Sequence, residues 1–274
     1  MSGADHFRVV GLNPYSSPRR QPDVARAISE HAAIRAALRD AGVRVADVTA
    51  PAGCQDGVFT ANWALVRGDT AVISRLPPQR RAEQRYAQRR LRDLGFRTVT
   101  APYRFSGQGD ALPAGNLLFV GSTYRTDPRM HQFLAERLGF EVIGLQTEPA
   151  RDEGGRPLVN SCTGWPDSLF YDLDLAISVI RPDLIAWCPA AFTPDSRARM
   201  RAVPVEKIEV SLPEALRFAC NLFSTGRTVV MGADAPDLRA ALEARGLTTV
   251  TPTVRELGKG GGYIRCTTLT LDNR

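Results

Sequence analysis

A unit of short strands and one helix recurs along this chain, and this recurrence constrains the fold more than any other feature of the sequence. Apolar spacing and stop signals predict five helices, over residues 23–41, 81–94, 128–138, 194–202 and 235–245. Between them, apolar and β-branched runs beside turn residues predict strands over residues 64–67, 71–74, 117–120, 175–180, 184–188, 228–231 and 263–271. We therefore expect an α/β fold in which about five such units form a closed, propeller-like array, with an open α/β sheet as the alternative.

The length of 274 residues fits one large domain or two small ones. No shift of composition marks a linker, so we expect a single domain over residues 1–274. A chain of this size buries about three quarters of its unfolded surface and needs no disulfide or metal for stability. The predicted αβ units lack a G-x-G-x-x-G start, which argues against a dinucleotide-binding fold.

The composition argues against several classes of protein. The net charge is +6, but 33 of the 35 basic residues are arginines, which indicates codon usage across a genome rather than a nucleic-acid site. The sequence has no run of 18 apolar residues, and its first residues lack the basic and apolar regions typical of a secretory signal, so we expect a cytoplasmic protein without membrane contact. Five widely spaced cysteines and three scattered histidines predict neither a disulfide framework nor a metal site, and we expect no cofactor.

Two polar clusters lie in loops that precede predicted strands. Asp56 and Asn62 bracket the run Gly57 to Ala61, and both side chains could accept hydrogen bonds from a cationic group. In the run from Ser106 to Asp110, glycines on both sides of a polar residue permit a close approach of the backbone to a ligand. An Asx turn and a surface hairpin turn are the structural alternatives for these two clusters.

Two further clusters involve acids and a cysteine. Asp172 and Asp174 open an apolar strand, and strand alternation would place them on one face, which is costly unless they are solvated, paired or bound to a cation. Cys266 follows three consecutive glycines near the chain end, so its thiol is a candidate nucleophile. A solvated strand entry and a small buried apolar cysteine are the alternatives.

Two arginines also follow predicted strands. Arg75 and Arg125 could together hold a carboxylate through paired hydrogen bonds. In a chain with this many arginines, a solvent-exposed surface role is the alternative for either residue.

Taken together, these clusters resemble the guanidino-group-modifying (pentein) superfamily, and are most similar to dimethylarginine dimethylaminohydrolases and bacterial amidinotransferase-like hydrolases. The resemblance covers nearly the whole chain in matching order and spacing. It is carried by His6-Phe7, Asn13-Pro14-Tyr15, Asp56 to Asn62, Gly107 to Leu112, Val120-Gly121 with Arg125-Thr126, Phe170 to Asp174, Lys259 to Gly262 and Arg265 to Leu269.

The resemblance implies a five-bladed αβ propeller and covalent catalysis by a cysteine. In the family, a thiolate attacks the guanidinium carbon, a histidine protonates the departing amine, and a carboxylate orients that histidine. The resemblance assigns Cys266 as the nucleophile, with Asp56 and Asn62 holding the guanidinium. It also implies that Arg75 and Arg125 hold the carboxylate of an amino-acid substrate.

Two positions depart from the family pattern. A strand that reads Phe-Tyr-His-Leu-Asp in relatives has Asp172 in place of the histidine, and a loop that reads Phe-Glu-Gly-x-Gly-Asp has Ser106 in place of the glutamate. The two losses are coupled, because the glutamate has no task without the histidine. Asp172 could act as the general acid if burial or its neighbours Asp110 and Asp174 raise its pKa. We therefore count Asp172 and Asp110 with Cys266 as catalytic, and Ser106 and Asp174 as substrate-binding.

The expected function is hydrolysis of a small guanidine of the arginine or N-methylarginine type. It would proceed through a covalent thiouronium intermediate and give a citrulline-type ureido product plus amine or ammonia. A weak or inactive guanidine-binding protein is one alternative, because the family histidine and glutamate are absent. An amidinotransferase is the other. Assembly into a homo-oligomer is left open.

Overall fold

In the computed structural model, which describes residues 1–273, the chain forms four three-stranded sheets of one topology. In each sheet a tight hairpin joins two antiparallel strands, and a helix then leads to a third strand that pairs in parallel with the second. A short turn suffices for an antiparallel pair, whereas a parallel pair needs a crossover, and the helix supplies it. The sheets are therefore repeated β-β-α-β units.

The four units follow one another along the chain. The first contains β1 (Ala64–Arg67), β2 (Thr70–Ile73), α2 (Arg81–Asp93) and β3 (Arg97–Thr100), and the second contains β4 (Ala111–Ala114), β5 (Leu117–Gly121), α3 (Arg129–Leu138) and β6 (Glu141–Leu145). The third contains β7 (Ile177–Arg181), β8 (Leu184–Trp187), α4 (Pro194–Ala202) and β9 (Glu206–Glu209). After the short helix α5 (Leu212–Ala215), the fourth contains β10 (Phe223–Ser224), β11 (Thr228–Val230), α6 (Pro236–Glu243) and β12 (Thr248–Val250).

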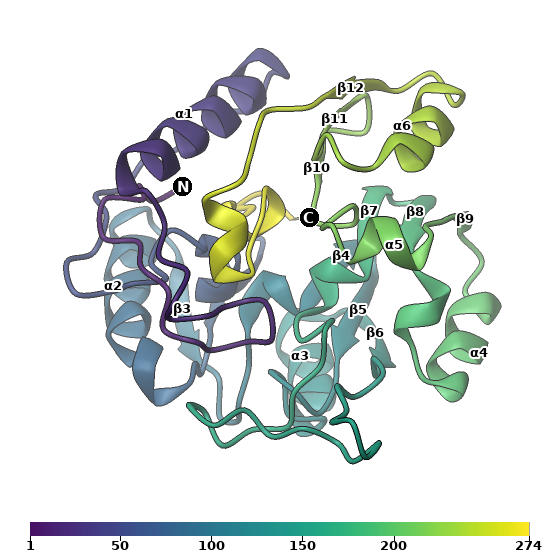
Figure 1. Cartoon of the computed structure of the whole chain (residues 1–274), viewed down its shortest axis with the longest axis horizontal. Coiled ribbons are helices and arrows are strands. Elements are labelled where there is room, and N and C mark those ends of the chain that lie inside the picture. Colours follow the sequence, from purple (N-terminus) through teal and green to yellow (C-terminus); the bar gives the residue numbers. More distant parts are fainter. Residues whose placement is uncertain (274) are drawn as a thin grey trace.

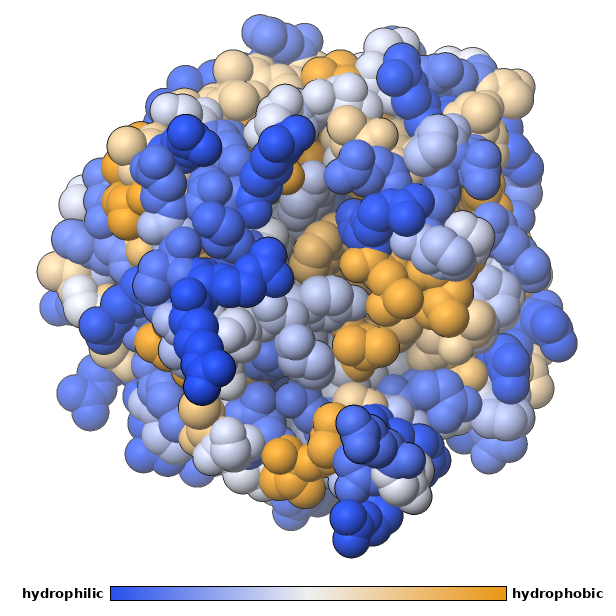
Figure 2. All heavy atoms as spheres, viewed as in Figure 1, coloured by the Kyte–Doolittle hydropathy of each residue, from blue (hydrophilic) through white to orange (hydrophobic). Residues whose placement is uncertain are grey.

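The helices surround a centre to which the C-terminal segment returns. Helices α1 (Val24–Asp40), α2, α4 and α6 lie at the outside of the molecule, and the C-terminal segment lies toward its middle (Figure 1). The central strands carry the most deeply buried side chains, among them Phe119 on β5 and Trp187 on β8, both with no exposed surface. Hydrophilic side chains cover most of the face seen in Figure 2.

The five predicted helices and the predicted hairpins are confirmed, with ends that differ by one or two residues. The third, parallel strand of each unit was not predicted. The mixed α/β class is confirmed, but a five-bladed propeller is not, since residues 1–273 contain four such sheets. Outside them, Ser2 and Val48 form a parallel bridge on either side of α1.

At the site, one predicted strand is wrong and another begins later than predicted. Residues 263–271 form no strand, and the chain there makes a 3₁₀ turn over Arg265–Thr267. Residues 173–175 also form a 3₁₀ turn, with the amide of Ala176 bonded to Leu173 O at 2.9 Å, so β7 begins only at Ile177. Strand alternation therefore does not set the directions of Asp172 and Asp174.

No helix within residues 1–273 combines the length and the apolar character that a bilayer crossing requires.

The buried central strands predict where stability resides. Replacing Phe119 with alanine would leave a cavity in β5 and should lower the free energy of unfolding by about 3–5 kcal/mol, as measured by urea titration. The control Leu94→Ala, at a side chain that is 46% exposed, should change it by less than about 0.5 kcal/mol. Equal, small losses for both variants would contradict the assignment of the core.

Candidate active site

A narrow cavity lies where loops from distant parts of the chain converge. Four of the predicted residues line it, together with Arg80 and Tyr171, which were not predicted. The lining consists of Leu12, Asn13, Asp56, Phe59, Asn62, Arg80, Arg125, Tyr171, Gly260, Gly262 and Cys266. The predicted residues Asp110, Ser106, Asp172 and Asp174 are buried directly around it and bond to residues of the site.

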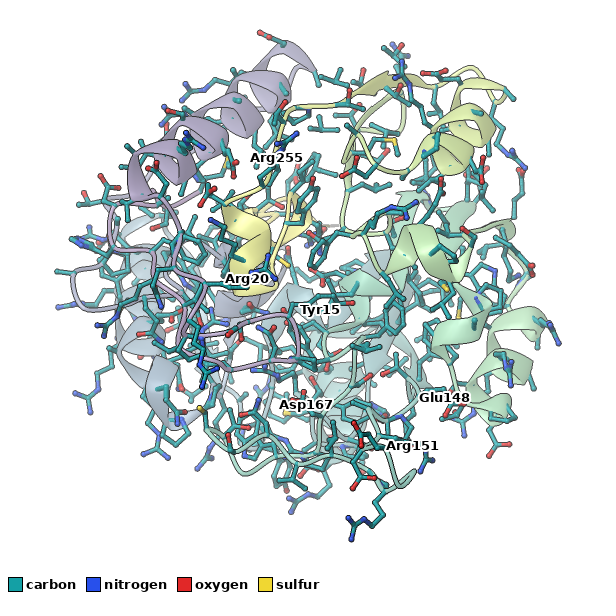
Figure 3. All side chains as sticks on the ribbon, in the orientation of Figure 1. Tyr15, Arg20, Glu148, Arg151, Asp167 and Arg255 are labelled. Carbon is teal, nitrogen blue, oxygen red and sulfur yellow. The ribbon has the colours of Figure 1, made fainter. Side chains whose placement is uncertain are left out.

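The N-terminal loop covers this cavity. Asn13 accepts hydrogen bonds from the amides of Tyr15 and Ser16, and its Nδ2 donates to Gly260 O at 2.8 Å. Gly261 has a φ of +86°, and a Cβ there would lie 2.3 Å from Asn13 Oδ1, so this close contact requires glycine. Tyr15, which Figure 3 places near the middle of this face, belongs to the same loop.

Cys266 lies at the base of the cavity with two polar partners. Its side chain is 2% exposed, and its thiol lies 3.3 Å from Asp174 Oδ2, to which it donates. Asn221 holds the cysteine from both ends, since its Nδ2 donates to Sγ at 3.2 Å and its Oδ1 accepts from the Cys266 amide at 3.2 Å. Burial, reinforced by the negative charge of Asp174, raises the pKa of the thiol well above its ordinary value. Without a bound cation, Cys266 is therefore a neutral thiol.

Three buried aspartates interact with one another beside the cavity, and one of them, Asp174, contacts the sulfur. Burial raises the pKa of Asp172. For Asp110 and Asp174, burial and the charge of the neighbouring Asp172 act together: the pKa of Asp110 rises well above its usual value, and the pKa of Asp174 rises to about 8. Asp172 Oδ2 accepts from Asn62 at 2.8 Å, and Asp110 Oδ1 accepts from the Leu173 amide at 3.0 Å. Asp172 Oδ1 and Asp174 Oδ1 are buried without a hydrogen-bond partner among the described residues. Two carboxyl oxygens of this cluster therefore lack a hydrogen-bond donor.

Asn62 and Ser106 hold Asp172 in place. Besides its bond to Asp172, Asn62 Nδ2 donates to Ser106 Oγ at 2.9 Å, and Asn62 Oδ1 accepts from Arg80 at 3.0 Å. The amide of Asn62 is therefore engaged on both sides. A Cβ on Gly109 would lie 2.3 Å from Asn62 Nδ2, so glycine is needed for the 3₁₀ turn over Gly107–Gly109 to approach this pair.

Arg80 organises the other end of the cavity. It donates to both oxygens of Glu83, at 3.0 and 2.7 Å, and its Nε lies 3.7 Å from Asp56 Oδ2. Burial raises the pKa of Asp56 to about 6, in spite of the opposing charge of Arg80. Asp56 is thus placed at the cavity wall in an ion-pair network.

Of the two predicted carboxylate-binding arginines, the structure brings one to the cavity. Arg125 lines it, stacks over the Tyr171 ring at 4.7 Å and donates to Leu12 O at 2.5 Å. Arg75 is exposed and donates to Pro102 O at 2.6 Å, so its assignment to the substrate site is wrong. Ser74 takes the inward direction after β2, and the extended backbone then turns Arg75 outward.

Arg80 and Asn221 were missed for different reasons. Arg80 opens the arginine-rich helix α2, and its spacing of three residues to Glu83 was a usable signal of pairing. Asn221 lies in a loop between apolar residues, where nothing in the sequence indicates contact with a residue 45 positions away.

The comparisons with known proteins agree with this geometry. Residues 18–163 match the family model of eukaryotic N,N dimethylarginine dimethylhydrolase. The N(G),N(G)-dimethylarginine dimethylaminohydrolase of Mycobacterium tuberculosis is 30% identical over 261 residues, which cover 95% of this chain and 80% of that protein. The chain belongs to the dimethylarginine dimethylaminohydrolase family. The superfamily predicted from the sequence is confirmed, and with it membership of a group of hydrolases that act on C–N bonds of guanidino groups.

Part of a bifunctional protein and the N-terminal domain of another protein are also similar to this chain. The bifunctional arginine dihydrolase/ornithine cyclodeaminase AgrE of Nostoc sp. is 29% identical over 278 residues, but the chain spans only 37% of its length. A solved structure of the N-terminal domain of ArgZ, a cyanobacterial arginine dihydrolase, was determined as a cysteine-to-serine mutant bound to substrate. It superposes with a TM-score of 0.87 at 26% identity and covers 100% of this chain and 97% of that domain.

The bonds of Asn221 predict a role in ionising the nucleophile. Its donation to sulfur stabilises a thiolate by about 1.5–3 kcal/mol, so Asn221→Ala should raise the pKa of Cys266 by at least about one unit. Alkylation of the Cys266 peptide by iodoacetamide at pH 8 should then slow about tenfold, while the surface variant Asn116→Ala should react as wild type. An unchanged pH profile in folded Asn221→Ala would show that the bond does not act on the thiolate.

The raised pKa of Asp174 predicts a pH-dependent effect on stability. Its carboxyl holds a proton up to about pH 8 when folded but releases it near pH 4 when unfolded, so rising pH destabilises the folded state across this window. Asp174→Asn should therefore gain stability relative to wild type from pH 4 to pH 8 in urea titrations. Asp127→Asn, at a carboxyl whose pKa is about 2, should show a constant difference. A constant difference for Asp174→Asn would contradict the assignment.

Proposed function

We propose that this protein hydrolyses a guanidine of the arginine or N-methylarginine type to a ureido product and an amine or ammonia. The observation that carries the proposal is the thiol of Cys266, 3.3 Å from Asp174, beside two buried carboxylate oxygens that lack donors. A guanidinium is a planar cation with donors on every nitrogen, and so supplies both the charge and the hydrogen bonds that the cluster lacks.

Binding of the cation activates the nucleophile. A positive charge beside Asp172 and Asp174 lowers the pKa of both carboxyls and of the Cys266 thiol, which reverses the effect of burial. Asp174 Oδ2 is already in contact with the thiol and takes its proton. The thiolate therefore forms when substrate is present, next to the carbon that it attacks.

The proposed reaction has two covalent stages. Cys266 Sγ forms a bond to the guanidinium carbon, the departing nitrogen takes a proton from a carboxylic acid, and the C–N bond breaks to release the amine. This leaves a thiouronium cation on the enzyme. Water then adds to the same carbon and gives up a proton to the carboxylate, the C–S bond breaks, and the ureido product leaves with the thiol restored.

Asp172 is the proposed acid in place of the family histidine. Burial raises its pKa above the ordinary value, which favours the protonated form, and the bond from Asn62 fixes its orientation. General acid catalysis contributes typically about 10²–10⁴-fold, so the substitution retains a group able to protonate the amine. A second candidate function is a guanidine-binding protein with little turnover. It is favoured by the absence of the family histidine, replaced by Asp172, and of the family glutamate, replaced by Ser106.

Arg125 is the proposed partner for the substrate's carboxylate. It lines the cavity, makes one hydrogen bond to a backbone carbonyl, and forms no ion pair among the described residues. Arg80 is bound to Glu83 and Asn62, so we assign it to holding Asn62 and Asp56 in place.

We also infer that the two ends of the chain together contribute the fifth unit of a propeller. Helix α1 would be the helix of this unit, because it lies between Ser2 and Val48, which form a parallel bridge.

Turnover tests the proposed function. Incubation with L-arginine, N-methylated arginines and agmatine should give ureido product from the amino acids, and less from agmatine, which lacks the carboxylate that Arg125 would bind. Cys266→Ala should abolish product, and Asp172→Asn should lower kcat by about 10²–10⁴-fold. Asp172→His with Ser106→Glu should raise activity if the site is a weakened form of the family site.

The guanidine-binding alternative gives a different result. It predicts no ureido product with any of these compounds, together with an increase in Tm when arginine is added. That outcome would replace hydrolysis by binding as the function of this site.

A further inference from the structure

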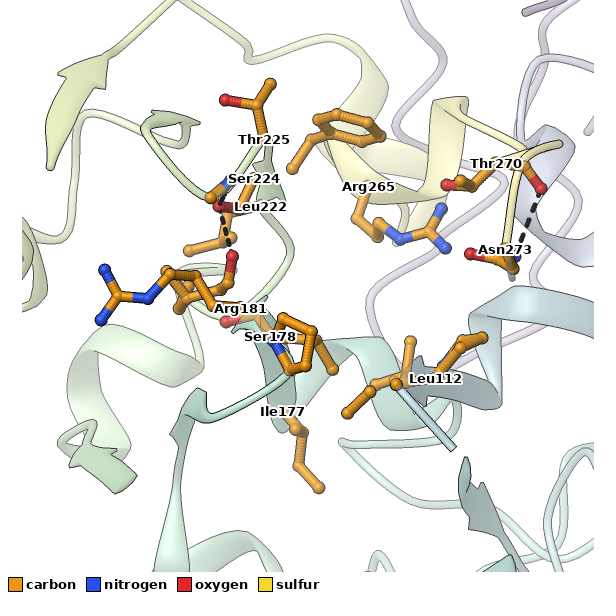
Figure 4. A pocket seen from close by; sticks show the side chains of 18 of the residues that line it. Leu112, Ile177, Ser178, Arg181, Leu222, Ser224, Thr225, Arg265, Thr270 and Asn273 are labelled. Carbon is orange, nitrogen blue, oxygen red and sulfur yellow. Dashed lines mark hydrogen bonds between the residues drawn. The ribbon is translucent and has the colours of Figure 1, made fainter. Parts of the chain in front are cut away.

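A second and larger cavity lies directly behind the nucleophile. It has a volume of about 380 Å³, within the range of small-molecule sites, and is lined by β7, the β4–β5 turn, the loop before β10 and the C-terminal segment (Figure 4). Arg265 and Cys220 face it, while the next residues in the chain, Cys266 and Asn221, belong to the active site. The two cavities therefore share a thin wall.

Arg265 brings to this wall a positive charge that no carboxylate of the described residues contacts directly. Its guanidinium donates only to neutral acceptors, namely Thr268 O at 2.8 Å, Thr268 Oγ1 at 2.9 Å and Gln108 Oε1 at 2.9 Å. Among residues 1–273, no carboxylate lies within ion-pair distance of it, although it lies deep enough for burial to lower its pKa. Asp174 acts on this charge only at longer range, and an anion in the cavity would pair with the guanidinium directly.

Ser178 gives an independent sign of a missing ligand. The side chain is 4% exposed and lines the cavity, and its Oγ has no hydrogen-bond partner among the described residues. Buried hydroxyl groups normally have a partner, and its absence points to a polar group supplied from the cavity. Leu112, Ile177 and Leu222 form an apolar wall beside it.

Two other charged residues line the cavity. Arg181 lies 3.4 Å from Asp183, so its charge is already matched. Asp272 is exposed in the C-terminal segment and faces solvent as well as the cavity. Neither residue removes the need for an anion at Arg265.

We propose that this cavity binds a small organic carboxylate, with its anionic end at Arg265, its apolar body on the Leu112 wall and a second polar group at Ser178. The bound anion opposes ionisation of Cys266. Arg265 is next to Cys266 in the chain, and its positive charge interacts favourably with a thiolate there, so neutralising that charge makes the thiolate less favourable. The ligand is thus a negative effector of the nucleophile, and its binding does not depend on turnover.

Calorimetry with 4-hydroxybenzoate as probe tests the site, with 4-hydroxybenzamide as its uncharged match. The carboxylate should bind the full chain, and the amide should bind at least tenfold more weakly. Arg265→Gln should weaken carboxylate binding at least tenfold, and Ser178→Ala should weaken it several-fold, since it removes one hydrogen bond. The Ser178 variant keeps the test valid if Arg265→Gln does not fold.

Two controls locate the binding. Arg181 lines the same cavity but is paired with Asp183, and Arg125 lines the substrate cavity instead. The variants Arg181→Gln and Arg125→Gln should therefore each bind the probe within twofold of wild type. Saturating probe should slow iodoacetamide alkylation of the Cys266 peptide in wild type but not in Arg265→Gln. Equal binding of acid and amide, loss of binding in Arg125→Gln, or no binding at millimolar probe would each overturn the proposal, whatever the enzyme's turnover.

Discussion

The site depends on the contact between the sulfur of Cys266 and the carboxyl of Asp174 inside a cluster of buried acids. Burial makes it unfavourable for the thiol and the neighbouring carboxyls to be charged together. In the proposed mechanism, the cluster is therefore inert when empty and becomes reactive when a planar cation enters. Recognition and activation of the substrate follow from the same electrostatic cause.

The fold supplies this arrangement by bringing together the segments that precede its repeated units. Loops that precede the first strands carry Asn62, Ser106 with Asp110, and Asp172 with Asp174, and short 3₁₀ turns fix their directions. The C-terminal turn then brings Cys266 against them, held by Asn221. Precise placement comes from this side-chain and backbone network, because none of these residues lies in a regular strand.

The sequence predicted the helices, the hairpins and most of the site because each has a local signal. Apolar spacing marks the helices, and motif order marks Cys266, Asp56 and the aspartate pair. The parallel third strands were missed because they are short and half exposed, as in Arg97–Thr100. Arg75 was wrongly assigned to the site because the direction of its backbone has no local signal. Asn221 was missed because its contact with Cys266 joins distant parts of the chain.

The most direct measurement of the central claim is the mass of the protein when it is quenched with acid during reaction with arginine. If the sulfur of Cys266 attacks the guanidinium carbon, a fraction of the chain carries the amidine-derived adduct, and peptide mapping places it on Cys266. The adduct should disappear as substrate is exhausted. Formation of ureido product by a Cys266→Ala variant, or an adduct confined to another residue, would contradict the account.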